Sequence, residues 1–172
     1  MKLIKPGVLC VMAAICGLAV LAGCGSENQY AFISMTKMSD STKVIRPGMT
    51  EDQIYSQLTE GIFNSGMDRG NSIKLKYEDK TVQNCVAIIS YGNGFQTEAG
   101  LSFNSKISDV LPLYEKEPGV TVVSNEATKI VLTKQIEGVN YNMTVRAQAN
   151  GGIKDITIYN ADLYTDNDAD HE

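Results

Sequence analysis

The chain has 172 residues, of which 43% are hydrophobic and 20% are charged, and its formal charge is −5. This composition is that of a globular domain and excludes a disordered chain or a multispan membrane protein. A single histidine, His171, excludes a multi-histidine metal site and argues against a histidine-based triad, and the negative charge argues against nucleic-acid binding.

The first 23 residues have the pattern of a secretory signal peptide. Lys2 and Lys5 form a basic start, and an uncharged, largely apolar run over residues 8–22 follows them. A basic start, an apolar core of about 7–15 residues and a small-residue exit are typical of such a leader. A transmembrane anchor is the alternative, but a helix of about 15 residues reaches only ~22 Å, which is short of the ~30 Å hydrocarbon core.

The apolar run ends in Leu21-Ala22-Gly23-Cys24. This tetrapeptide resembles the lipobox of bacterial lipoproteins. The resemblance implies lipid attachment at the sulfur of Cys24, cleavage just before it, and a lipid-anchored location on the extracytoplasmic face of a cell membrane. Two or three acyl chains would hold the protein stably, whereas one chain holds only marginally.

The remaining chain divides into three parts. We expect a tether with a possible first strand over residues 24–43, an α+β domain over 44–162, and an acidic disordered tail over 163–172. Acidic residues are frequent near the end of the chain: Asp162, Asp166, Asp168, Asp170 and Glu172. Three of these aspartates alternate as at the start of a calcium loop, but the glycine and the glutamate that such a loop requires are missing.

The first predicted elements are a strand over residues 30–35, a polar loop over 37–43 and a helix over 51–60. Thr50 offers an N-cap oxygen, and Gln53 at the third helical position completes a capping box. Ile54 and Leu58, four residues apart, share one face of this helix.

Strands are then predicted over residues 73–77 and 83–90, with a hairpin turn at Asn93-Gly94, because both residue types tolerate positive φ. Cys85 lies in the second, continuously apolar strand, which predicts a buried cysteine. After the predicted cleavage this cysteine has no partner for an intramolecular disulfide.

A second helix is predicted between Ser105 or Ser108 and Tyr114, and Pro112 favours the later start because proline is tolerated only in the first helical turn. Further strands are predicted over residues 120–123, 128–132, 139–148 and 153–159, with a hairpin turn at Asn150-Gly151. The third of these strands alternates apolar and polar residues without interruption.

The order of helix, strands and Asn-Gly hairpin occurs twice, with an offset of about 55 residues. We therefore predict an α+β fold with two short helices packed on antiparallel sheet. The predicted units are a tandem repeat over about 44–98 and 99–162. Sequence identity between the halves is slight, so a coincidence of pattern is the alternative.

The stretch from Pro47 to Ile54, followed by Leu58, resembles the Gly-Met-Thr helix start of small envelope lipoproteins of the outer-membrane-assembly type and the beta-lactamase-inhibitor-protein-like group. Residues 97–114 resemble the second helix entry of similar Gram-positive lipoproteins. The resemblance implies a helical layer on an antiparallel sheet, sometimes repeated. The Leu-Gly-x-Pro of the family is absent after the first helix, and the disulfides of the inhibitor protein cannot form with Cys85 alone, which argues against beta-lactamase inhibition.

Residue patterns for catalysis are missing from the sequence. It has no Gly-x-Ser-x-Gly elbow and no glycine loop that leads into a helix to hold phosphate. The carboxylate pairs Glu78-Asp79 and Glu115/Glu117 stand where strand or helix ends meet turns, which is typical of solvated side chains. We therefore expect no enzymatic activity, no cofactor and no metal ion.

The polar side of the alternating strand is the candidate binding face: Asn140, Asn142, Thr144, Arg146 and Gln148. Amides beside an arginine can hydrogen-bond a protein or a glycan, although antiparallel sheets commonly turn a polar face to water. We predict a non-catalytic protein-binding or assembly module that recognises an envelope protein. The alternative is a lipoprotein that binds a small ligand or a cell-wall glycan in a groove between the units.

Overall fold

The computed structural model describes residues 28–58, 67–68, 73–78, 84–167 and 171. Within these ranges the predicted α+β class is confirmed, with two short α-helices and antiparallel strands arranged in a three-stranded and a seven-stranded sheet. The predicted leader and Cys24 lie outside the described residues.

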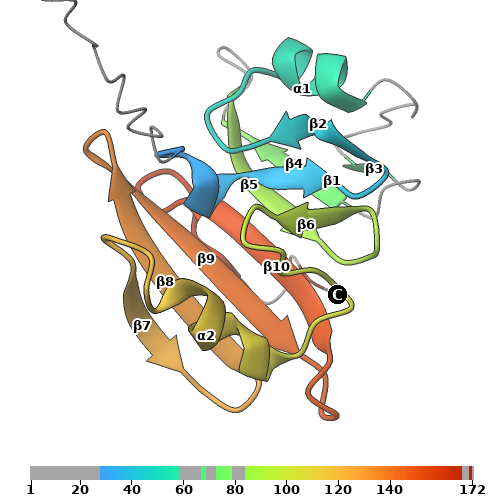
Figure 1. Cartoon of the computed structure of the whole chain (residues 1–172). Coiled ribbons are helices and arrows are strands. Elements are labelled where there is room, and N and C mark those ends of the chain that lie inside the picture. Colours follow the sequence, from blue (N-terminus) through green and yellow to red (C-terminus); the bar gives the residue numbers. More distant parts are fainter. Residues whose placement is uncertain (1–27, 59–66, 69–72, 79–83, 168–170, 172) are drawn as a thin grey trace, which may run out of the picture.

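The described elements follow one another along the chain as shown in Figure 1. They are the 3-10 turn η1 (Ala31–Ile33), β1 (Met35–Lys37), β2 (Asp40–Ile45), α1 (Glu51–Leu58), β3 (Met67–Asp68), β4 (Ile73–Tyr77), β5 (Cys85–Ser90), β6 (Phe95–Thr97), the 3-10 turn η2 (Ile107–Asp109), α2 (Val110–Tyr114), β7 (Thr121–Asn125), β8 (Lys129–Ile136), β9 (Val139–Ala147) and β10 (Ile153–Asn160).

The large sheet has the strand order β3-β4-β5-β10-β9-β8-β7, with every neighbouring pair antiparallel. It consists of two meanders that meet where β5 pairs with β10, for example at Ala87 opposite Tyr159. The small sheet has the order β2-β1-β6.

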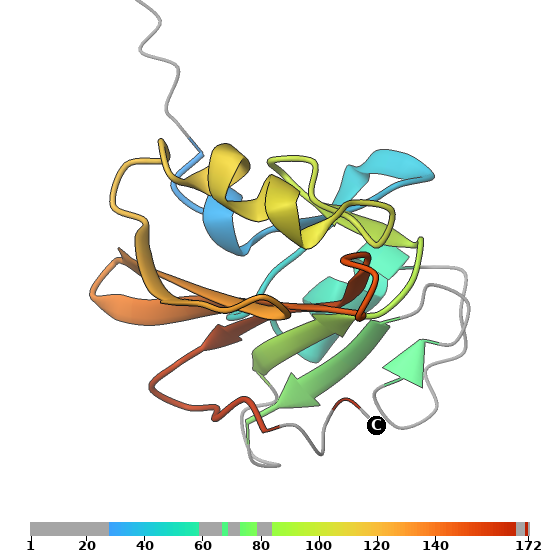
Figure 2. The same ribbon diagram turned by 90° about the horizontal axis from the view of Figure 1, so that it is seen from below.

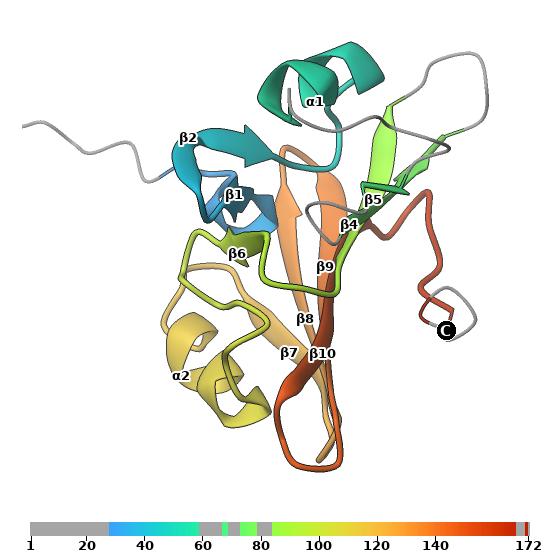
Figure 3. The same cartoon turned by 90° about the vertical axis from the view of Figure 1, so that its right-hand side faces the viewer.

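The large sheet is covered differently on its two faces. The helix α2, η1 and the small sheet lie against one face, and the C-terminal segment after β10 lies against the other (Figures 2 and 3). Side chains alternate between the faces along each strand. On β9, Tyr141, Met143 and Val145 join the hydrophobic core on the helical side, whereas Thr144 and Arg146 belong to the opposite side, which we call the polar face.

The predicted start of the first helix is confirmed. The Thr50 backbone N–H donates to the Gln53 side-chain oxygen at 2.8 Å, and the Gln53 N–H donates to Thr50 Oγ1 at 3.3 Å, which completes the capping box. Ile54 and Leu58 are both buried in the core, and α1 packs beside β2. The predicted end at residue 60 lies outside the described residues.

Three expectations for the first half are wrong. The predicted loop over 37–43 is largely strand β2, and the predicted strand over 30–35 is η1 followed by β1. Asn93-Gly94 does not close a hairpin between paired strands, because β6 pairs with β1 rather than with β5. Since β4 and β10 occupy both edges of β5, the chain after β5 must cross to the small sheet.

The second half follows its predictions closely. The turn η2 and helix α2 begin late, as Pro112 required, and the strands over 121–125, 129–136, 139–147 and 153–160 match the predicted ones. The predicted hairpin at Asn150-Gly151 joins β9 to β10, with Gly151 at φ +82° and the Gln148 N–H donating to the Gly152 carbonyl.

The tandem repeat stays a prediction. Each half contains a helix followed by antiparallel strands, but β6 leaves the large sheet, and no corresponding strand of the second half does so within the described residues. Residues 163–167 and 171 belong to the predicted tail and are described next, because they contact the polar face.

Candidate functional site

The predicted binding residues do not share one environment. Asn140 and Gln148 are exposed and Asn142 is half-buried, whereas Thr144 is buried and Arg146 is only 7% exposed. The prediction of an exposed polar row is therefore wrong at its centre. The reason is that part of the segment after β10 lies on this face of the sheet (Figure 3).

Arg146 faces a carboxylate on the neighbouring strand. Arg146 of β9 is opposite Asp155 of β10 in the antiparallel register, and its Nη1 donates to Asp155 Oδ1 at 3.1 Å. A β-bulge between Ile153 and Asp155 places Lys154 and Asp155 together opposite this arginine. The sheet itself thus brings a buried cation and a buried anion together.

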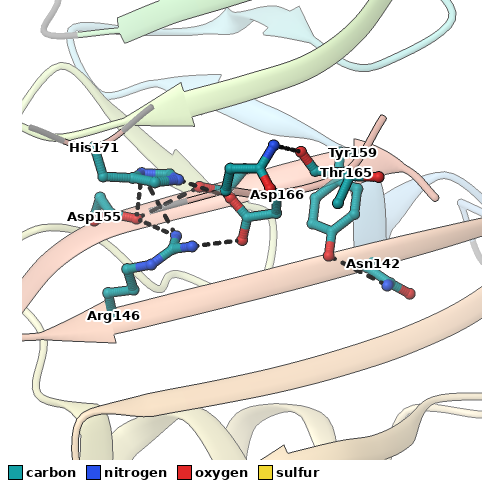
Figure 4. A network of polar contacts seen from close by, with 9 residues as sticks. Asn142, Arg146, Asp155, Tyr159, Thr165, Asp166 and His171 are labelled. Carbon is teal, nitrogen blue, oxygen red and sulfur yellow. Dashed lines mark hydrogen bonds and ion pairs between the residues drawn. The ribbon is translucent and has the colours of Figure 1, made fainter. Parts of the chain in front are cut away.

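The C-terminal segment adds two further ionisable groups. Arg146 Nη2 donates to Asp166 Oδ2 at 2.7 Å, and His171 Nε2 lies 2.7 Å from Asp166 Oδ1. The other ring nitrogen, Nδ1, lies 3.3 Å from Asp155 Oδ1. Figure 4 shows these four residues, which we call the charge cluster, held together across β9, β10 and the C-terminal segment.

The electrostatics of the charge cluster favour a permanently charged arginine. Burial by itself would lower the pKa of Arg146. The hydrogen bond from Arg146 to Asp166 and the negative charge of Asp166 act in the opposite direction, as do the charge and hydrogen bond of Asp155, and the pKa of Arg146 is raised above its usual value. Each ring nitrogen of His171 faces a carboxylate oxygen, and Nδ1 also lies 3.5 Å from Arg146 Nη1.

A second contact holds the segment before Asp166. The rings of Tyr159 and Tyr164 meet edge to face with centroids 5.5 Å apart, and Asn142 Nδ2 donates to the Tyr159 hydroxyl at 3.3 Å (Figure 4). These contacts and the charge cluster fix the described part of the C-terminal segment over β9 and β10. The expected solvated tail is therefore not observed at Asp166 and His171, whose side chains are 4% and 2% exposed.

The charge cluster is a network of mutually paired side chains. Its charged groups pair with one another, so the His171 imidazole is occupied by carboxylates. One oxygen of Asp155 and the hydroxyl of Thr144 are buried without a hydrogen-bond partner among the described residues. The described ranges also contain no group of three or more His, Cys, Asp or Glu side chains placed to hold a metal ion.

The polar face remains open on the side of β8. Val131 and Thr133 are half-buried and Gln135 is exposed on β8, opposite Thr144, Asn142 and Asn140 of β9, respectively. We call Val131, Thr133, Gln135, Asn140 and Asn142 the open polar face. Next to it, β7 forms one edge of the large sheet, and its Val123 is 60% exposed.

A cleft of about 510 Å³ lies between the N-terminal residues, the end of α2 and the β8–β9 turn, and it adjoins the open polar face at Gln135. It is lined by Asn28, Gln29, Ala31, Glu98, Glu117, Pro118, Lys134, Gln135, Ile136 and Glu137. Several of its polar side chains pair with one another: Lys134 with Glu117, Asn28 with Glu98, and Gln29 with Glu137. Among the described residues, no tyrosine, which would favour ligand stacking, lines this cleft.

Cys85 is buried at the start of β5, as predicted. Burial raises the pKa of its thiol to about 12. An unfolded cysteine titrates near pH 8.5, so between about pH 9 and 12 the unfolded chain binds fewer protons than the native protein, and stability falls as pH rises.

This linkage gives a testable pH dependence. Between pH 7 and pH 10 the free energy of unfolding should fall by about 2 kcal/mol more in the native sequence than in Cys85→Ala, as measured by urea denaturation. Burial also raises the pKa of Tyr77 and of Tyr114, but both tyrosines are present in both proteins. Equal losses in the two proteins would contradict the assigned thiol environment.

The described part of the chain has no helix with the length and hydrophobicity needed to cross a membrane. Comparison of the chain with family models, with curated proteins and with solved structures found no match.

Proposed function

We propose that this chain is a membrane-anchored extracytoplasmic lipoprotein that acts as a non-catalytic protein-binding or assembly module. The anchor is proposed from the Leu21-Ala22-Gly23-Cys24 motif after the apolar leader. The binding surface is the open polar face, extended by the edge strand β7.

The observation that carries the binding proposal is the uneven covering of the polar face. The C-terminal segment buries the side chains of Arg146 and Asp155, while Gln135 and Asn140 of the same face stay exposed. A surface of amides, a hydroxyl and a half-buried valine, beside the edge strand β7 with its exposed valines, has the polar and apolar mixture of a protein interface. In this proposal the buried charge cluster stabilises the fold and takes no part in catalysis.

Ligand binding is the second candidate, and the observation that favours it is the cleft of about 510 Å³. Its volume is within the range of small-molecule sites, and its amides and carboxylates could hydrogen-bond the hydroxyls of a glycan. Its paired side chains and the lack of an aromatic stacking surface make it the weaker candidate. Saturable binding of a soluble cell-wall fragment that is lost in Glu98→Gln/Glu137→Gln would favour this alternative.

Site-specific photo-crosslinking in cells tests the binding surface. A photoreactive phenylalanine analogue at Gln135 or Asn140 should capture the same protein from both positions, and the same analogue at exposed Glu115 or Lys116 at the end of α2 should not. The captured protein, once purified, should bind the chain directly. Capture from the control positions only, or no capture from Gln135 and Asn140, would contradict the proposed surface.

The anchor is tested by Cys24→Ser. Because the lipid would be carried by the Cys24 sulfur, this variant should incorporate no labelled palmitate and should accumulate as the uncleaved precursor, as seen by a shift in electrophoretic mobility. Cys85→Ser is the matched control and should be lipidated and cleaved normally. Palmitate incorporation in Cys24→Ser equal to that of the native sequence would overturn the anchor assignment.

A further inference from the structure

A shallow hollow of about 380 Å³ lies at the end of the polar face where β8 begins and β9 ends. Its lining comes from the β7–β8 turn and three neighbouring strands: Glu126, Thr128, Lys129, Arg146, Ala147 and Lys154. Three cationic side chains therefore surround one hollow in a chain whose formal charge is −5.

The strand register explains why these cations meet. Lys129 of β8 is directly opposite Arg146 of β9, and Lys154 is the extra residue of the β-bulge in β10, next to Asp155, which is opposite the same arginine. Like charges directly opposite each other in a sheet are destabilising. Arg146 is neutralised on its other side by Asp155 and Asp166, whereas neither Lys129 nor Lys154 has an ion pair with a described residue.

We propose that Lys129 and Lys154, on either side of Arg146, form an anion-binding notch that takes the carboxylates of an acidic polypeptide segment. This inference rests on the proposed function, because it names the chemistry of the protein partner. The notch continues the open polar face, since Lys129 lies on the same strand and the same side as Val131 and Thr133. A partner seated on that face would reach the notch at its end.

Carboxylate is the favoured anion because this surface already binds one. Asp166 of the C-terminal segment rests on Arg146 at 2.7 Å, so the guanidinium and its surroundings accommodate a polypeptide carboxylate. Thr128 also lines the hollow, and a threonine side chain can donate a hydrogen bond to a carboxylate. Glu126 is the one acidic residue of the lining, and its carboxylate accepts a hydrogen bond from Ser124 at 3.0 Å.

The separation of the two lysines favours a chain of carboxylates over a single small anion. Lys129 and Lys154 lie on strands separated by β9, so their backbones are about 10 Å apart. In an extended peptide, side chains two or three residues apart are separated by about 7–10 Å, and the flexible lysine side chains can adjust to that spacing. A single phosphate ion, by contrast, would bind both lysines only if their side chains converged on it from opposite sides.

The test uses the full chain in micelles of a neutral detergent. A fluorescent peptide of about ten glutamates should bind by anisotropy, with an affinity that falls as NaCl is raised, and a glutamine peptide of equal length should not bind. Lys129→Gln/Lys154→Gln should bind the glutamate peptide about 5-fold more weakly at low salt, because it removes both exposed cations of the notch. Lys106→Gln/Lys116→Gln removes the same charge from exposed positions and should stay within ~2-fold of the native sequence.

Charge reversal gives a second readout. Lys129→Glu/Lys154→Glu should lose the glutamate peptide and gain binding of a lysine peptide, with a thermal melt showing that the variant folds. Equal weakening in the control variant, or no binding of the glutamate peptide, would overturn the notch. So would lysine-dependent binding to vesicles of anionic phospholipid or to inorganic phosphate in place of the peptide. Crosslinks from Gln135 and Asn140 that survive Lys129→Gln/Lys154→Gln would leave the proposed function intact while refuting the notch.

Discussion

Arg146→Met is expected to lower the free energy of unfolding by about 3–5 kcal/mol, because it removes the guanidinium that pairs with two buried carboxylates. Methionine preserves most of the side-chain length, so the loss reports the missing charge and hydrogen bonds rather than a cavity. Asp155 and Asp166 would lose their guanidinium partner and keep their contacts with the ring nitrogens of His171.

Urea denaturation at neutral pH measures this loss, and Lys129→Met is the matched control. Lys129 lies directly opposite Arg146 on the next strand but forms no ion pair with a described residue, so its replacement should change stability by less than ~1 kcal/mol. A double-mutant cycle with Asp166→Asn should give a coupling energy of at least ~1 kcal/mol between the two side chains. Equal effects of Arg146→Met and Lys129→Met would show that the charge cluster does not stabilise the fold.

The charge cluster could be predicted only in part from the sequence. The alternation along β9 correctly placed Arg146 on the polar side of the strand, but alternation alone does not say whether that side is covered. The covering segment is acidic and follows β10, and an acidic segment is normally solvated. The sequence did contain one signal for this contact. A lone arginine lies on a strand face, and residues 162–172 contain several aspartates and the only histidine of the sequence, which could pair with it.

The Asn93-Gly94 turn shows a second limit of structure prediction from the sequence. An Asn-Gly pair specifies a backbone that can reverse, and at Asn150-Gly151 that backbone joins two paired strands. After β5 the same pair leads to the small sheet, because β4 and β10 already use both hydrogen-bonding edges of β5. Local residue preferences predict turns, whereas the partner of the following strand depends on which edges the rest of the chain leaves free.

Capping and helix-face patterns were predicted more accurately because they depend on residues close in sequence. The reciprocal bonds of Thr50 and Gln53 need no information from elsewhere in the chain. The burial of Ile54 and Leu58 adds one non-local fact, namely that something apolar covers this face.

Ile54→Asp is expected to destabilise the protein by at least ~4 kcal/mol, and the variant should be largely unfolded at physiological temperature. The Ile54 side chain is fully buried in the hydrophobic core, and α1 packs beside β2 of the small sheet. A carboxylate at this position would have to be desolvated without a partner or expelled by displacing the helix.

Two further variants separate a buried charge from a general defect of the helix. Tyr55→Asp introduces the same residue at the adjacent position, where the side chain is 40% exposed, and should cost less than ~1 kcal/mol beyond the loss of the tyrosine contacts. Ile54→Val keeps an apolar side chain and should cost about 0.5–1.5 kcal/mol in urea denaturation, through one lost methylene group. The two aspartate variants introduce the same helix propensity and the same charge, so they differ in the burial of the replaced side chain. A similar loss of stability in both would mean that Ile54 does not lie on the packing face of α1, and the assignment of that face would be wrong.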